Sequence, residues 1–233
     1  MGSLTVADDG AAPLGLPAKG FFLSLEGIDG CGKTTQVRLL TERLSREGLE
    51  PLMAREPGGT QVGDLVRGVL LEARQLQMQP LTELLLFFAS RAENAQQVIR
   101  PALRDGRIVV CDRFTDASVA YQGHGRGLGG KLVESLKTLV LGDLEPDLTI
   151  WLDIPVGTAL ARAFARLGDQ DRMESLGPEF FRRVRGGYAK IAADNPSRVL
   201  RIDASGTASH VADRVYKAVA AALDARNMSA ARS

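Results

Sequence analysis

The chain has 233 residues, of which 45% are hydrophobic and 24% charged, so it is long enough to bury a sizeable core and has an ordinary globular composition. Its formal net charge of +1 excludes a general electrostatic attraction to nucleic acid or membranes. The sequence has no apolar run near the roughly 20 residues of a membrane span and no start typical of a signal peptide, which predicts a cytoplasmic protein.

Strand-like and helix-like segments alternate from residue 20 onward. Strands are predicted at 21–25, 51–54, 107–111, 148–153 and 199–203. Helices are predicted at 36–46, 62–71, 81–103 with an end near Pro101, 131–141 and 208–223. A helical stretch also reaches Tyr121, ahead of a glycine-rich run at 123–130 that we expect to be flexible, and another begins after Pro155.

This alternation predicts a single α/β domain over residues 20–225, between a disordered N-terminal tail (1–19) and a C-terminal tail (226–233). We expect a parallel β-sheet of about five strands covered by helices on both faces. In such a sheet, ligands bind at the carboxyl ends of the strands.

Residues 27–35 follow the first strand directly and fit the phosphate-binding pattern GxxxxGK[ST]. The glycines allow the backbone N–H groups to turn towards a triphosphate, Lys33 adds positive charge, and the Thr34 hydroxyl can hold a magnesium ion. The pattern therefore predicts a P-loop NTPase fold that binds a nucleoside triphosphate.

The phosphate loop alone does not identify the phosphoryl acceptor. The chain lacks the Asn-Lys-x-Asp element with which a regulatory GTPase reads guanine, which argues against a GTPase switch. A partitioning ATPase, another motor-like protein and a non-catalytic nucleotide-binding protein all stay open on the loop alone.

Arginines follow the strand ends and recur in glycine-bearing loops. Asp29, Arg55, Asp112 and Arg113 all fall at the carboxyl ends of predicted strands. An acceptor that is itself a phosphate needs planar, permanently charged groups, and the transition state needs more positive charge than Lys33 and one metal ion provide. The arginines therefore favour an enzyme with a phosphate acceptor.

Six motifs together resemble bacterial thymidylate kinases. They are EGIDGCGKTT at 26–35, REPGGT at 55–60, FFASR at 87–91, DRF at 112–114, AYQG at 120–123 and DR at 171–172, and the resemblance runs from about residue 20 to 223. It implies a nucleoside monophosphate kinase that uses ATP and Mg²⁺ to phosphorylate dTMP to dTDP, and it implies a homodimer. The ATP-binding residues would be Gly27, Asp29, Gly30, Cys31, Gly32, Lys33, Thr34 and Thr35.

The resemblance also implies roles around dTMP. Asp29 would bind the 3′-hydroxyl, Arg55 and Arg113 would hold the acceptor phosphate, and Asp112 would help Thr34 to position magnesium. The remaining contacts would be Phe87 stacking on thymine, Arg91 on a thymine carbonyl, Ser118 near N3, Tyr121 against the 2′ position and Gln122 over the pocket.

The same matching implies a short lid at about 166–177. Some family members carry a catalytic arginine in the phosphate loop, where this chain has Gly30, so the lid must supply it. Arg166 is the preferred candidate and Arg162 the second, and they would act with Lys33, Arg113 and Asp29. No general base is needed because the acceptor oxygen of dTMP is already ionised.

The alternative enzyme is a deoxynucleoside kinase, which transfers to a neutral 5′-hydroxyl and needs a base. Glu56 resembles the carboxylate that those enzymes use. Arg55 and Arg113 argue against this alternative, because an uncharged acceptor has no use for paired arginines.

Overall fold

The structure is a computed structural model, and it describes residues 20–72, 76–165, 173 and 176–230. Its centre is a five-stranded parallel sheet with the order β2-β3-β1-β4-β5. The strands are β1 (Phe21–Glu26), β2 (Leu52–Arg55), β3 (Ile108–Asp112), β4 (Leu148–Asp153) and β5 (Val199–Asp203). Every residue of β1 and β4 is buried, as expected for parallel strands covered on both faces. The predicted α/β class and strands are confirmed.

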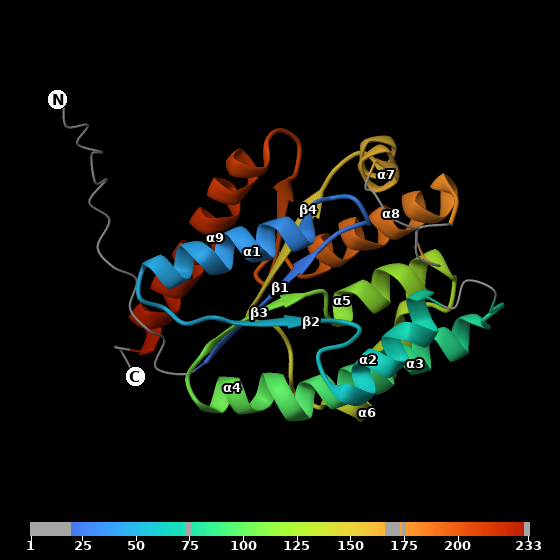
Figure 1. Cartoon of the computed structure of the whole chain (residues 1–233), viewed down its shortest axis with the longest axis horizontal. Coiled ribbons are helices and arrows are strands. Elements are labelled where there is room, and N and C mark those ends of the chain that lie inside the picture. The colour runs from blue at the N-terminus through green and yellow to red at the C-terminus, as the bar shows by residue number, and fades with distance from the viewer. Residues whose placement is uncertain (1–19, 73–75, 166–172, 174–175, 231–233) are drawn as a thin grey trace.

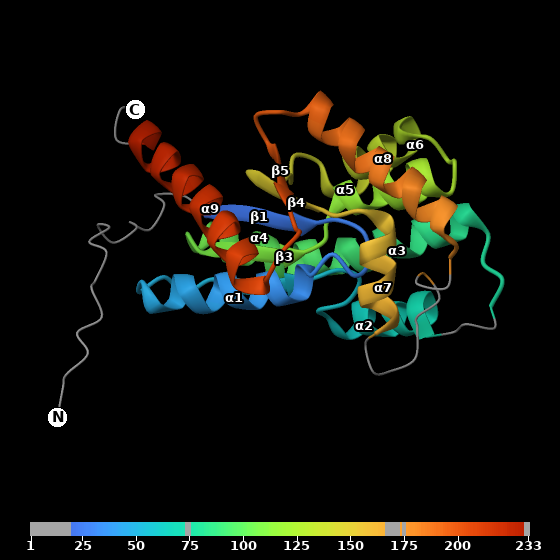
Figure 2. The ribbon, with the colours of Figure 1, turned by 90° about the horizontal axis from the view of Figure 1, so that it is seen from above.

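Helices cover both faces of this sheet (Figures 1 and 2). On one face, α1 (Lys33–Arg46) packs against β1, whose Leu23 and Leu25 belong to the core, and α9 (Ala208–Ala230) packs against α1, β4 and β5. On the other face, Phe22 packs with Ile99 and with α4 (Arg100–Arg104), while α8 (Pro178–Asp194) contacts β4 and β5. Among the described residues, no helix has the length and apolar character needed to cross a membrane.

Most of the remaining helices lie around the carboxyl ends of the strands, and α6 (Gly130–Leu141) leads from there back towards Phe22 (Figure 1). The remaining helices are α2 (Gln61–Arg67), α3 (Pro80–Asn94), α5 (Thr115–Ser118), α6 and α7 (Val156–Phe164), with wider π-helical turns at η1 (Gly68–Glu72), η2 (Ala95–Ile99) and η3 (Val119–Gly125).

The helix predicted at 81–103 is a succession of α3, η2 and α4 that ends at Arg104, not near Pro101. Proline has no N–H and its ring crowds the preceding turn, so it normally breaks a regular helix. Here the Arg100 N–H bonds to the Ala95 carbonyl, five residues back. This wider turn admits Pro101 at the start of the next helix.

The prediction that the glycine-rich run at 123–130 is flexible was wrong for its first part, because η3 extends the helix to Gly125. A Cβ on Gly125 would lie 2.7 Å from the Phe180 ring of α8. Gly125 therefore permits close packing of η3 against α8. At the other end of the chain, α9 continues to Ala230, past the predicted end at Leu223.

The register of the strands brings the motifs together. Leu25 of β1 pairs with Asp112 of β3, and Asp112 in turn pairs with Arg55 of β2. The phosphate loop follows β1 and Arg113 follows β3, so three motifs that lie far apart in the sequence meet at one edge of the sheet.

Candidate active site

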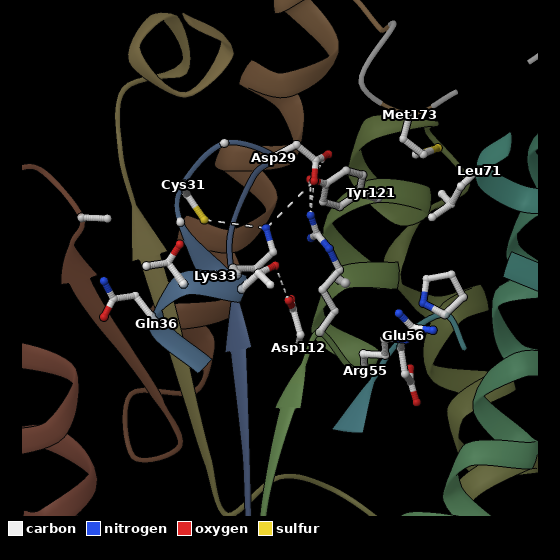
Figure 3. A pocket seen from close by; sticks show the side chains of 18 of the residues that line it. Asp29, Cys31, Lys33, Gln36, Arg55, Glu56, Leu71, Asp112, Tyr121 and Met173 are labelled. Atoms are coloured by element: carbon white, nitrogen blue, oxygen red, sulfur yellow. Dashed lines mark hydrogen bonds and ion pairs between the residues drawn. The ribbon is translucent and has the colours of Figure 1, made fainter. Parts of the chain in front are cut away.

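A cavity of about 810 Å³ opens at this edge of the sheet (Figure 3). Nearly all the predicted site residues line it: Asp29, Gly30, Cys31, Gly32, Lys33, Thr34, Thr35, Arg55, Phe87, Arg91, Asp112, Arg113, Ser118, Tyr121, Gln122 and Arg162. Gly27 does not line the cavity, but its carbonyl accepts hydrogen bonds from Lys33 and Arg113. Arg166 and most of the predicted lid lie outside the described residues.

The phosphate loop wraps around the Lys33 side chain, which is only 7% exposed. Its Nζ donates to the carbonyls of Gly27 at 3.0 Å and Ile28 at 3.2 Å. Gly32 adopts a φ of +99° and leads into α1, so the free N–H groups of that helix begin at the loop. Gly30 also has a positive φ, and a Cβ there would lie 1.9 Å from the Ala159 carbonyl of α7. The loop therefore excludes any side chain at this position.

Thr34 is in direct contact with Asp112, which lies beside Lys33 (Figure 3). The Thr34 hydroxyl donates to Asp112 Oδ2 at 2.8 Å. The pair offers a hydroxyl and a carboxylate oxygen on the cavity wall, and these are the hard oxygen ligands that magnesium prefers.

Asp29, Arg113 and Tyr121 form a closed network. Arg113 Nη2 donates to Asp29 and, at 3.1 Å, to the Tyr121 oxygen, while the Tyr121 hydroxyl donates to Asp29 at 2.9 Å. Burial opposes ionisation of Asp29, but Arg113 and Lys33 hold its pKa below the usual value. Burial raises the pKa of Tyr121 well above its usual value. The network is therefore an ionised carboxylate held by a cation and a neutral phenol.

Arg91 occupies the opposite wall and is 1% exposed. Its three nitrogens donate to Glu56 at 2.5 Å, to the Ser118 hydroxyl at 3.0 Å and to the Phe114 carbonyl at 3.0 Å. Phe87 lies one turn earlier on α3 and lines the same cavity, as the spacing of four residues predicts.

Three further predicted residues lie at the edges of the cavity. Arg55 is 55% exposed, and its Nη2 donates to Asp64 at 3.1 Å. Gln122 is buried and donates to Glu83 at 2.9 Å. Arg162 of α7 donates to the Ala204 carbonyl at 3.4 Å.

The sequence motifs did not identify every residue at the site. The cavity extends to the segment after β5, where Ala204, Gly206, Ala208 and Val211 line it. Small and apolar residues without a motif carry no signal that a sequence pattern could detect. Behind Arg113, the buried Tyr188 accepts a hydrogen bond from its guanidinium and donates one to the buried Glu26, and the motifs gave neither residue a role.

Glu56, the base of the alternative enzyme, is buried in a side-chain network. Arg91 and Asn94 donate to its carboxylate. Burial raises the pKa of Glu56, although Arg91 opposes this effect. The carboxylate therefore serves to hold Arg91.

Comparison with known proteins identifies the family of this chain. The family model described as thymidylate kinase matches residues 25–215. A thymidylate kinase of Citrifermentans bemidjiense is 50% identical over 192 residues, which cover 80% of this chain and 85% of the relative. A thymidylate kinase of Pseudomonas fluorescens is 52% identical over 185 residues, covering 79% and 88%. The crystal structure of thymidylate kinase from Ehrlichia chaffeensis superimposes with a TM-score of 0.70 at 37% identity, covering 86% of this chain and 98% of that one. The chain therefore belongs to the thymidylate kinase family.

Proposed function

We propose that this protein transfers the γ-phosphoryl group of ATP to the 5′-phosphate of dTMP, which gives dTDP and ADP. The observation that carries the proposal is that one cavity is lined by Lys33 of the phosphate loop together with Arg55 and Arg113. Lys33 suits a triphosphate donor, and the two arginines suit an acceptor that is already anionic. Membership of the thymidylate kinase family supports the same pair of substrates.

In this proposal dTMP lies between the two walls of the cavity. Arg55 and Arg113 bind its phosphate, and the Asp29 carboxylate accepts a hydrogen bond from the 3′-hydroxyl. Tyr121 lies against the sugar. On the opposite wall Phe87 stacks on thymine.

Three side chains of the cavity wall would contact the edge of the thymine base. Arg91 and Ser118 are hydrogen-bonded to each other, so they present a fixed polar edge to the ring. Gln122, held by Glu83, closes over it.

Thr34 and Asp112 are the residues that would hold a magnesium ion. Their oxygens fit the ion, and their contact at 2.8 Å places both at the loop that receives the triphosphate. A bound Mg²⁺ would neutralise charge on the phosphates of ATP.

An arginine outside the phosphate loop completes the site, because the loop has no room for a side chain at Gly30. Arg162 lines the cavity from α7. Arg166, which lies outside the described residues, is the preferred candidate because it falls in the predicted lid at 166–177.

The chemical step needs charge and position more than acid–base chemistry. An ionised phosphate oxygen of dTMP attacks the γ-phosphorus, the bond to ADP breaks, and the electron pair moves onto the β-phosphate of ADP. Lys33 and Arg113 stabilise the charge that spreads over the phosphoryl oxygens. Closure of the lid would exclude water that otherwise hydrolyses ATP.

A coupled ADP-release assay that offers dTMP and thymidine side by side tests this function. We expect turnover with dTMP and none with thymidine, because Arg55 and Arg113 need an anionic acceptor. Multiple turnovers per active site exclude a non-catalytic nucleotide-binding protein. A preference for thymidine that Glu56→Gln abolishes would falsify the proposal in favour of a deoxynucleoside kinase.

We also propose that the protein is a cytoplasmic homodimer, joined through α2 and α3. These adjacent helices expose the large apolar side chains Val62, Leu65, Leu81 and Leu85. A second copy of the chain would cover this face, because the burial of apolar surface away from water lowers the free energy.

A further inference from the structure

We infer that Glu26 is a positioning residue for the acceptor phosphate, because its carboxylate fixes both the backbone and the guanidinium of Arg113. Neither the phosphate-loop pattern nor the cavity lining assigns a task to Glu26. The inference rests on the proposed role of Arg113 in binding dTMP.

The first oxygen of the carboxylate controls the backbone next to Arg113. Glu26 is fully buried at the end of β1, and its Oε1 accepts a hydrogen bond from the Phe114 N–H at 2.7 Å. On the preceding peptide, the Arg113 N–H donates to the Leu25 carbonyl at 3.1 Å. Arg113 itself has a φ of +73°, a left-handed conformation that is uncommon for residues other than glycine. Hydrogen bonds on both sides of Arg113 therefore hold it in a conformation it would otherwise leave.

The second oxygen controls the guanidinium through Tyr188. Glu26 Oε2 accepts a hydrogen bond from the Tyr188 hydroxyl at 2.8 Å, and the Tyr188 oxygen accepts one from Arg113 Nη1 at 3.4 Å. A phenol has a single proton, so donation to Glu26 leaves its lone pairs for Arg113. The other terminal nitrogen of Arg113 binds Asp29 and Tyr121. The guanidinium is thereby held on two sides, with Tyr188 sharing Nη1 with the Gly27 carbonyl, which accepts from it at 2.9 Å.

The Tyr188 ring is itself fixed. It stacks on Trp151 of β4, with ring centres 6.2 Å apart and planes inclined by 19°. It also meets the Tyr121 ring edge-on at 6.4 Å. The Tyr188 hydroxyl therefore has a fixed position between Glu26 and Arg113.

The buried position of the Glu26 carboxylate lowers the stability of the fold. Burial raises the pKa of Glu26 to about 7, with Asp116 adding to the rise and Arg113 opposing it. Cys111, Tyr188 and Arg198 are the other titratable or charged groups that interact with it. An apolar residue would be the simpler occupant of this site, so the carboxylate is explained by what it holds.

Three variants separate the two hydrogen bonds. Glu26→Ala removes both bonds to the carboxylate. Tyr188→Phe removes the bonds that the Tyr188 hydroxyl makes to Glu26 and to the guanidinium, and it leaves the bond from the Phe114 N–H. Glu26→Gln keeps an acceptor for the Phe114 N–H, but its amide donates where the carboxylate accepted, so Tyr188 loses the acceptor for its proton. The inference predicts a graded series in which Glu26→Ala is the most affected.

The measurements are the KM values for dTMP and ATP, and the Kd for dTMP by calorimetry without ATP. We expect Glu26→Ala to raise the Kd for dTMP at least about tenfold, the loss expected when hydrogen bonds to a charged group are removed. Glu26→Gln and Tyr188→Phe should lie between this variant and the wild type. The KM for ATP should change less than about twofold in all three, because Lys33 and the loop carbonyls do not contact Tyr188.

Matched controls are Tyr216→Phe and Asp153→Asn. Tyr216 lies on α9 beneath Arg43, and Asp153 is a buried carboxylate at the end of β4 that binds Arg185 and Arg201. Both should keep the wild-type KM for dTMP. The inference is overturned if Tyr188→Phe and Glu26→Gln bind dTMP like the wild type, or if they weaken ATP and dTMP equally. A wild-type enzyme that does not turn over dTMP would instead overturn the proposed function.

Discussion

At the scale of single residues, the buried charge of Glu26 links stability to pH. Its pKa rises from the usual 4.5 to about 7, with burial as the largest cause. Between these two values the folded protein keeps a proton that the unfolded chain releases, so the free energy of unfolding falls as the pH rises through this window. The shift corresponds to about 3 kcal/mol at most. The native fold is therefore less stable above about pH 7, where Glu26 is ionised, than at pH 5.

Glu26→Gln removes this titration. Relative to the wild type, we expect the variant to gain up to about 3 kcal/mol in free energy of unfolding between pH 5 and pH 8. Urea unfolding of both proteins at the two pH values measures the difference. An offset between the two proteins that is the same at both pH values would contradict the raised pKa.

The missing loop arginine gives a second prediction at this scale. Arg166→Ala should lower kcat by about 10³-fold, the effect of losing an arginine that stabilises the transferring phosphoryl group, while the Kd for dTMP stays nearly unchanged. Arg162→Ala is the matched comparison, because Arg162 already lines the cavity. Should Arg162→Ala show the large loss and Arg166→Ala keep normal turnover, the role belongs to Arg162.

The residues that the sequence predicts best are those held in short contiguous motifs. Lys33 and Thr34 are fixed by the geometry of one loop, so their spacing alone locates them. The contact of Glu26 with Tyr188 joins positions 162 residues apart, and no local pattern carries it. Their partnership becomes visible only once α8 is packed on the sheet.

At the scale of elements, two glycines in neighbouring helices have opposite effects on stability. Gly125 of η3 lies against the Phe180 ring, whereas Gly186 of α8 has no neighbouring atom within 4 Å of a Cβ. The first glycine makes room for a helix contact. The second only weakens its helix, because glycine has more freedom to lose than alanine.

Alanine at these two positions should therefore act with opposite signs. Gly186→Ala should raise the free energy of unfolding by up to about 1 kcal/mol. Gly125→Ala should lower it by about 1–3 kcal/mol, because the Phe180 ring must move. Thermal and urea unfolding of the two variants provide the measurement, and a stabilised Gly125→Ala variant would contradict the packing described for η3 and α8.

Element boundaries were the part of the fold that local patterns predicted least well. Pro101 and the glycines at 123–130 are normally signals for a break. In this fold, the wide turn η2 accommodates the proline, and η3 continues through Gly125, which packs against α8. In both cases tertiary packing overrides the local preference.

At the scale of the whole molecule, alternation of strands and helices predicts the class, while the strand order requires the structure. The order β2-β3-β1-β4-β5 depends on which strands pair, and this is not encoded in any single segment. The position of the site can be predicted without the strand order, because the carboxyl ends of parallel strands share one edge of the sheet in any order. This is why Asp29, Arg55 and Arg113 could be grouped in advance.

The proposed dimer is tested at the same scale. Leu65 is 75% exposed on α2, and Leu65→Glu places a charge in the face that a second copy would cover. We expect light scattering to give a dimer for the wild type and a monomer for this variant. Met228→Glu, at an exposed position of α9, is the control and should remain a dimer. A wild-type monomer would contradict the proposal.

The stacking of Trp151 on Tyr188 has a practical consequence. Trp151 is the sole tryptophan of the chain, so all of its indole emission arises beside the Glu26–Tyr188–Arg113 chain. Fluorescence excited selectively in the indole band therefore reports on this one region and can follow occupancy of the acceptor subsite in solution without a dye or a coupled enzyme.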